Sequence, residues 1–202
     1  MSVCSRPDKD KAGAFQPAHS IVQQWPEETL ADKLKLCDGG TGLLERCKQA
    51  NNGVDVKIEV GSTRQHSLGG LADLKKGSVF IRNGDPECIQ IETLVFELGR
   101  FARRRDIQAI DAEAAGGDLD REEYIRQNAA IEFDCLQDVI TAVDKCSDKW
   151  DCARHVFDCD VFRSAKDFDD YFDNYLSPVD KERFGAVWDG SFQKYYLSKH
   201  PE

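Results

Sequence analysis

Glu97 is the residue of this sequence that is best placed to do chemistry, because it is an acid within a largely apolar helical pattern. Apolar residues recur from Ile91 to Ala102 at the three- and four-residue spacing of an amphipathic helix. Glu97 flanks this apolar stripe, one turn from both Leu94 and Phe101. A carboxyl group in such a place can share a proton, act as a general base or hold a cation.

The surrounding segment has the frame of the zinc-binding motif H-E-x-x-H without its histidines. In that motif, two imidazoles one turn apart hold the ion, and the glutamate between them activates water. Here Phe96 and Arg100 stand at the histidine positions and Glu97 at the glutamate position. Because neither replacement supplies an imidazole nitrogen, the sequence predicts that this helix does not hold a catalytic zinc.

A second acid, Glu132, falls on the apolar face of the next predicted helix. The two long helices are joined by a short turn at Gly116 and Gly117, so we expect them to pack antiparallel and to bring Glu97 and Glu132 together. A buried acid pair would share a proton or hold a cation. The structural alternative is that each glutamate contacts an arginine, such as Arg100 or Arg103, or a backbone amide.

His66 lies in the predicted loop that precedes this helix, between two strands. If the chain is an enzyme, its catalytic candidates are Glu97, Glu132 and His66. The alternative is that His66 is an ordinary exposed loop side chain. The four histidines are not spaced for a shared metal site, so the sequence predicts neither a metal nor another cofactor.

The hydrophobic periodicity predicts a mostly helical α+β fold with a sheet of two or three strands, a long central helical hairpin and a C-terminal helical cap. We expect helices at residues 25–36, 41–50, 88–115, 120–145, 165–176 and 178–197, strands at 54–60 and 78–82, and glycine-containing turns or loops at 38–40, 61–70 and 116–117. Residues 1–24 are predicted to be a flexible leader, and residues 25–202 a single domain.

The eight cysteines include no C-x-x-C pair, which argues against a zinc ribbon or a thioredoxin-type site. Their even number and loose spacing favour disulfides formed in an oxidising compartment. Candidate bridges join Cys37 with Cys47, and Cys146 or Cys152 with Cys159. The alternative is that the cysteines are buried, reduced thiols that pack as small apolar residues.

The composition describes an acidic protein, with 32% charged residues and a formal net charge of −10. Such a surface repels phosphates, so nucleic acid is excluded as a partner. The short basic run Arg103 to Arg105 is expected to lie on a solvated helix face. No apolar stretch is long enough to cross a bilayer, and the polar residues 1–11 do not have the pattern of a cleavable signal peptide.

The order of elements resembles small bacterial zincin-like effector and toxin domains. It runs through a strand, a Gly-Gly loop, a second strand, the helix with Glu97 and a later helix with Glu132, and it covers residues 54–143. The resemblance implies that Glu97 corresponds to the general base and Glu132 to an acidic third ligand. It divides the domain into a zincin-like core at 25–145 and an extension at 146–202 that is rich in cysteine and aromatic residues. Phe96 and Arg100 depart from the family pattern at both histidines.

With those histidines replaced, the resemblance implies a pseudoenzyme. We expect a secreted bacterial effector-like interaction protein, exported by a specialised system without a cleavable signal peptide, that binds a protein partner in a host or competitor cell. One alternative is a hydrolase that uses Glu97 and Glu132. Another is an acidic immunity protein that neutralises a toxin through charge complementarity.

Overall fold

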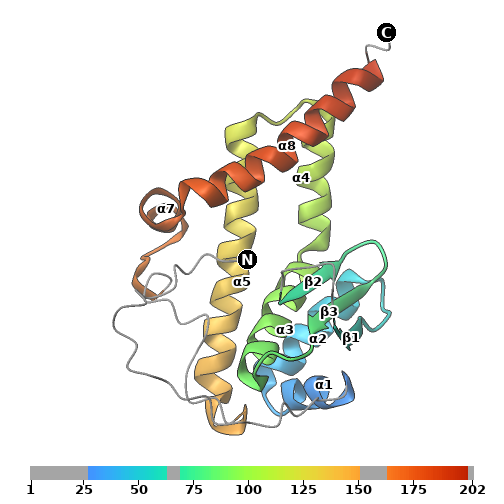
Figure 1. Cartoon of the computed structure of the whole chain (residues 1–202), viewed down its shortest axis with the longest axis vertical. Helices are drawn as coiled ribbons and strands as arrows, with labels where there is room; N and C mark the ends of the chain where they lie inside the picture. The colour runs from blue at the N-terminus through green and yellow to red at the C-terminus, as the bar shows by residue number, and fades with distance from the viewer. Residues whose placement is uncertain (1–26, 63–68, 151–162, 200–202) are drawn as a thin grey trace.

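A computed structural model describes residues 27–62, 69–150 and 163–199 (Figure 1). Its helices are α1 (Glu27–Lys35), α2 (Asp38–Ala50), α3 (Glu87–Ala102), α4 (Arg104–Gly116), α5 (Arg121–Trp150), α7 (Phe168–Asp170), the π-helix η2 (Tyr171–Tyr175) and α8 (Pro178–Lys199), and its strands are β1 (Lys57–Gly61), β2 (Gly70–Asp73) and β3 (Ser78–Arg82). The predicted mostly helical α+β class is confirmed. The predicted leader and His66 lie outside the described residues.

A disulfide joins Cys37, at the turn between α1 and α2, to Cys146 in the last turns of α5. The predicted bridge from Cys37 to Cys47 is therefore wrong. The two residues stand at the start and near the end of α2, and ten residues of helix separate them by about 15 Å, which is too far for a disulfide. Cys47 is instead a buried free thiol that donates to the Leu98 carbonyl at 3.2 Å.

A bridge between Cys146 and Cys159, which was also predicted as a candidate, is excluded because Cys146 is bonded to Cys37. Cys88 also takes part in a disulfide, whereas Cys135 is a second buried free thiol. Both interpretations of the cysteines therefore apply, each to different residues. The predicted bridge between Cys152 and Cys159 lies outside the described residues.

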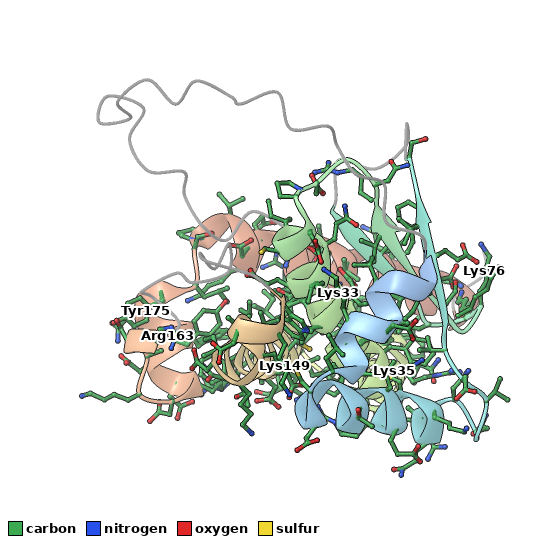
Figure 2. All side chains as sticks on the ribbon, turned by 90° about the horizontal axis from the view of Figure 1, so that it is seen from below. Lys33, Lys35, Lys76, Lys149, Arg163 and Tyr175 are labelled. Atoms are coloured by element: carbon green, nitrogen blue, oxygen red, sulfur yellow. A yellow bond between two sulfur atoms is a disulfide. The ribbon has the colours of Figure 1, made fainter. Side chains whose placement is uncertain are left out.

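The end of α5 lies against the end of α1. Lys149 and Trp150 of α5 each donate a hydrogen bond to a backbone carbonyl near the C-terminus of α1, at Leu36 and Lys33 respectively. Figure 2 shows Lys149 on the end of α5 beside the α1 helix that carries Lys33 and Lys35. The predicted end of this helix at residue 145 is thus too early, since α5 continues to Trp150.

The sheet has the order β1-β3-β2, with β1 parallel and β2 antiparallel to β3. The central strand β3 places Val79 and Ile81 in the core, where both are fully buried. The strand β2 occupies the end of the predicted glycine-containing loop. Its four residues are too few to show the alternation by which a strand is recognised in a sequence, and it pairs with β3 through a turn that Gly77 closes at φ +73°.

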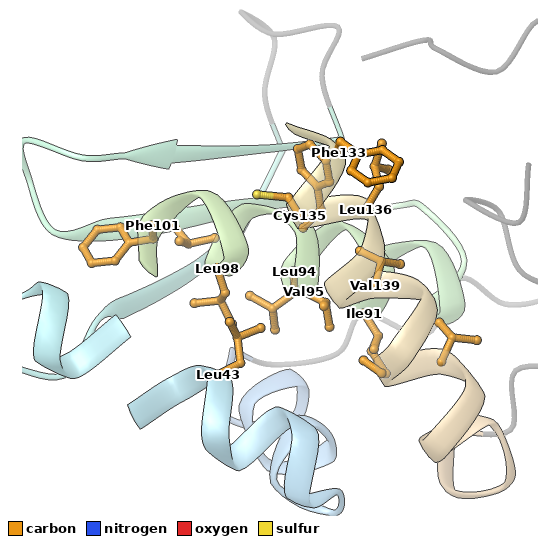
Figure 3. Close-up of a cluster of buried hydrophobic side chains, with 14 of the residues drawn as sticks. Leu43, Ile91, Leu94, Val95, Leu98, Phe101, Phe133, Cys135, Leu136 and Val139 are labelled. Carbon is orange, nitrogen blue, oxygen red and sulfur yellow. The ribbon is translucent and has the colours of Figure 1, made fainter. Parts of the chain in front are cut away.

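Helix α3 is the centre of the core, because residues 90–99 are all buried. One side of α3 packs on α2 through Leu43, and another packs on α5 through Leu136 and Val139 (Figure 3). The sheet covers a third side, where β2 and β3 contact the helix. A helix enclosed in this way must be apolar on most faces, which leaves its buried acids as the exceptions that need partners.

The first arm of the helical hairpin is broken at Arg103, so the single helix predicted at residues 88–115 is wrong. The backbone N–H of Arg103 donates to Arg100 at 3.2 Å. The Gly99 carbonyl, which a continuous helix would pair with that N–H, accepts Nη1 of the Arg103 side chain at 3.1 Å. The same nitrogen donates to Asp138 of α5 at 2.7 Å, so an ion pair stabilises the break.

The other two arginines of the basic run connect α4 to the end of α2. Arg104 donates to the side-chain oxygen of Asn51 at 2.7 Å, and Arg105 donates to that of Asn52 at 3.1 Å. Arg103 itself is mostly buried in its ion pair. The expectation of a solvated helix face therefore holds for Arg105, which is exposed, and not for Arg103 and Arg104, which are only partly exposed.

The predicted C-terminal cap is present, and α8 lies across the tips of α4 and α5 (Figure 1). Its Trp188 donates to the Leu119 carbonyl at 3.1 Å. The aromatic residues of this region mainly pack inside, since Tyr171, Phe172 and Phe184 are buried. Within the described ranges, no helix has the length and apolar character to span a membrane.

Residues 38–40, predicted to be a turn, form the first turn of α2 instead. A glycine is required at position 40, since a Cβ there would lie 2.0 Å from the Leu34 carbonyl oxygen of α1. Gly40 therefore allows α2 to start directly beneath the end of α1.

We predict that Gly40→Ala lowers the free energy of unfolding by about 1–3 kcal/mol, the usual cost of overpacking a core. Urea denaturation followed by circular dichroism measures the change. The matched control is Gly42→Ala in the same helix, where nothing lies within 4 Å of the added methyl group. That control should be neutral or stabilising by up to about 1 kcal/mol because alanine favours helix. Equal losses in both variants would contradict the close approach.

Candidate functional site

Glu97 of α3 is 2% exposed, and its Oε2 atom accepts the backbone N–H of Ala72 at 2.9 Å. Ala72 belongs to the edge strand β2. In an antiparallel pair, every second residue of a strand forms hydrogen bonds with the neighbouring strand. The N–H of Arg82 on β3 donates to Gly69, so Gly69 is one of the bonded residues. Ala72, an odd number of residues further along, therefore directs its N–H away from β3. Glu97 thus satisfies a polar group at the edge of the sheet that the neighbouring strand cannot reach.

Gly70 makes this contact sterically feasible. A Cβ at position 70 would lie 2.6 Å from Cγ2 of Thr93 and 3.0 Å from Cγ of Glu97. A side chain there would push β2 away from α3 and lengthen the hydrogen bond to Ala72. The Gly69–Gly70 pair, which suggests a simple turn in the sequence, therefore includes the point at which the strand and the helix touch.

The environment of Glu97 raises its pKa above the ordinary value of 4.5. The largest cause is burial, which removes the charged carboxylate from water. The positive charge of Arg100 and the N–H of Ala72 lower the pKa, and the negative charge of Glu132 raises it. Glu97 therefore holds its proton to a higher pH than an exposed glutamate does.

Glu132 of α5 is 6% exposed and has a different partner. Nη2 of Arg183, on α8, donates to its Oε1 and Oε2 atoms at 3.1 and 3.0 Å. Arg183 also lies 3.9 Å from Asp180 of its own helix. This ion pair attaches the C-terminal cap to the second arm of the hairpin.

The hairpin brings Glu97 and Glu132 within electrostatic range of each other, since the charge of Glu132 acts on the pKa of Glu97. Their hydrogen bonds, however, run to different elements. Glu97 contacts a backbone amide and Glu132 an arginine, so each acid has the kind of internal contact that the structural alternative expects. The arginine is Arg183, and the sequence suggested only Arg100 or Arg103 from the same hairpin.

The thiols close to these acids are not activated. Burial raises the pKa of Cys135 to about 12, although Arg103 and Arg100 act in the opposite direction. Burial likewise raises the pKa of Cys47 to about 12. Both side chains are therefore protonated near neutral pH and are poor nucleophiles.

The two positions that would carry zinc-binding histidines differ in their surroundings. Phe96 is 2% exposed and belongs to the hydrophobic core. Arg100 is partly exposed, and its positive charge lowers the pKa of both Glu97 and Cys135. In the parts of the chain that the structure describes, no group of three or more His, Cys, Asp or Glu side chains is placed to hold a metal ion. His66 falls outside those parts, so its relation to the two acids stays a prediction.

Arg183 and Ala72 are the members of this site that sequence reasoning missed. Arg183 lies 51 residues from Glu132 in a helix whose own pattern carries no sign of the pairing. Ala72 contributes only its backbone N–H, which every residue except proline possesses. The arrangement consists of two separate buried polar contacts, one between β2 and α3 and one between α5 and α8, and the acid of the first holds its proton to a higher pH than an exposed glutamate does.

We predict that Glu97→Gln flattens part of the pH dependence of stability. Because the folded state raises the pKa of Glu97, the stability that its protonated form provides is complete below about pH 4.5, and it declines as the pH rises through the folded pKa. The glutamine can still accept the Ala72 N–H and never ionises. At pH 8 the variant should be more stable than the wild type, because the wild-type carboxyl group must ionise while it is buried.

Urea denaturation of both proteins between pH 4 and pH 8 measures this effect. The matched control is Glu132→Gln. It replaces the carboxylate that accepts two hydrogen bonds from Arg183 with a neutral amide, so it should be less stable than the wild type at pH 8. A wild-type stability that rises across the window relative to Glu97→Gln would show that the ionised Glu97 stabilises the fold, against the prediction.

Comparison of the chain with protein-family models, with curated proteins and with solved structures finds no match.

Proposed function

We propose that this chain acts by binding a protein partner, and that its enzyme-like pair of acids serves the fold and performs no catalysis. The observation that carries the proposal is the use of both carboxylates inside the domain. Glu97 accepts the Ala72 N–H, and Glu132 accepts the Arg183 guanidinium with both of its oxygens.

The exposure of these acids supports the same proposal. A general base must come within hydrogen-bond reach of the proton that it removes from a substrate or a water molecule. Glu97 and Glu132 are 2% and 6% exposed, and Phe96 fills a ligand position with a core side chain. An interaction role needs none of these groups at the surface.

The disulfides support an oxidising compartment. Cys37 is bonded to Cys146, and Cys88 takes part in a further bridge, an arrangement that is rare in reducing cytosol. We therefore propose that the chain is secreted. From the order of its elements we further propose a bacterial effector-like protein that a specialised system exports and that binds a protein in a host or competitor cell. The net charge of −10 and the use of Arg103 and Arg104 within the fold disfavour nucleic acid as that partner.

One observation favours the alternative, a hydrolase. Glu97 is a buried acid with a raised pKa, and such groups are enriched at catalytic sites. Ion-pair networks and buried structural acids produce the same perturbation, so the raised pKa alone does not select catalysis. The two hypotheses differ in what the loss of the Glu97 charge does.

The test is capture of partners from host and competitor-cell lysates with the immobilised full chain and with Glu97→Gln. We expect both proteins to retain the same partner, and titration calorimetry with the purified partner should give equal affinities, because Glu97 is buried away from any interface. The wild type should also fail to hydrolyse peptide or ester substrates. Hydrolysis by the wild type that Glu97→Gln loses, while both remain folded, would overturn the proposal in favour of the hydrolase.

A further inference from the structure

The junction between α1 and the end of α5 is held by three contacts that come from two regions far apart in the sequence. The disulfide joins Cys37 to Cys146, which are 109 positions apart in the sequence, with a Cα–Cα distance of 6.0 Å. One helical turn further along α5, Lys149 and Trp150 donate hydrogen bonds of 2.8 Å to the α1–α2 turn and to α1. All three contacts lie at the same end of α1.

The two hydrogen bonds add partners to carbonyls at the end of α1, where the backbone runs out of intrahelical donors. The Leu36 carbonyl, just past the helix, accepts from Lys149, and the Lys33 carbonyl accepts both Trp150 and the Leu36 N–H, the latter at 3.2 Å. The positive charge of Lys149 also suits the negative end of the helix dipole. The end of α5 therefore acts as the C-terminal cap of α1.

Helix α1 has only 9 residues, and a helix of that length is marginal in water without tertiary contacts. It packs on α2, β1 and α3, and its Lys33 forms an ion pair with Glu87 of α3. At the junction, Trp150 of α5 is 1% exposed. Separation of the end of α5 from α1 would therefore release Trp150 to solvent, while α1 stays packed on the other elements.

The rest of the core does not depend on the disulfide for its connections. Helix α2 is attached independently by the Cys47 hydrogen bond to Leu98 and by the ion pair of Arg46 with Asp138 at 3.1 Å. The packing of α3 on α5 and the contact of Glu132 with Arg183 also involve no residue of α1.

We propose that the Cys37–Cys146 disulfide is a redox latch on the end of α5: its reduction frees the last turn of α5 from α1 while the α3–α5 core stays folded. The latch requires no partner protein, so it stands independently of the proposed function. Its effect would be to make apolar surface around Trp150 available only after the chain has moved from an oxidising to a reducing environment.

The opening reaction is a thiol–disulfide exchange with a cellular dithiol. A thiolate of the dithiol attacks one sulfur, the bond between Cys37 and Cys146 breaks, and the cysteine that leaves takes up a proton. The second thiol of the dithiol then attacks the mixed disulfide and releases the other cysteine. Two electrons pass to the protein, and the dithiol becomes a disulfide. Because Cys37 is 4% exposed and Cys146 is fully buried, the attack follows a local opening of the junction.

The test is hydrogen exchange of the oxidised full chain and of the double variant Cys37→Ala with Cys146→Ala, measured by mass spectrometry at neutral pH. We expect the amides of the last turn of α5 to exchange at least about tenfold faster in the variant, which corresponds to about 1.4 kcal/mol of local stability. The amides of α3 and of the middle of α5 should be unchanged. The matched control is Cys47→Ala, which removes a buried thiol of α2 and leaves the latch closed.

Three results would overturn the latch. The first is equal protection of the last turn of α5 in the oxidised chain and the double variant. The second is a uniform loss of protection across α1, α3 and α5, which would make the disulfide a global support. The third is peptide mapping of the untreated chain that finds Cys37 and Cys146 as free thiols. Should the double variant not fold, the double variant Cys37→Ser with Cys146→Ser takes its place, since it leaves the bridge of Cys88 intact, and the same three results decide.

Discussion

The burial of α3 is the constraint on which the rest of the structure depends. A helix covered by the sheet, by α2 and by α5 gains a large apolar contact area, but it also removes the carboxyl group of Glu97 from water. Three features offset the cost of burying this carboxyl group. It accepts the Ala72 N–H, it lies near the positive charge of Arg100, and its raised pKa keeps it protonated to a higher pH. Gly70 is part of the same solution, because only a residue without a side chain lets β2 approach closely enough to donate.

Helix α5 carries the constraint to the remaining elements. Along its length, Glu132 forms an ion pair with Arg183 of α8. Asp138 forms ion pairs with Arg103, at the break between α3 and α4, and with Arg46 of α2. At its end, Cys146 is bonded to Cys37 and Trp150 donates a hydrogen bond to α1. These joints are charged, covalent or hydrogen-bonded, and they surround an apolar interface. Acids that suggest catalysis in the sequence thus have an architectural use, since a buried charge that is paired fixes the position of its partner.

Much of the fold could be predicted because its signals are local. The periodic apolar residues predict the start of α3 and helices close to the observed bounds of α5 and α8, and the glycines at 116 and 117 predict the hairpin. The break at Arg103 could not be predicted, because no proline or glycine marks it and its cause is Asp138 on another helix. Strand β2 was missed for a similar reason, since four residues gain their strand geometry from pairing with β3.

The sequence by itself determined the apolar faces, the acids at 97 and 132 and the lack of histidines at 96 and 100, because residue identity and spacing along one element decide these features. Only the tertiary structure decided what the acids and cysteines touch. Ala72 meets Glu97 across 25 residues, Arg183 meets Glu132 across 51, and Cys37 meets Cys146 across 109. The packing of whole helices and strands determines which residues so distant in the sequence come into contact. No local sequence pattern specifies which donor reaches each acid or which cysteine bonds to Cys37.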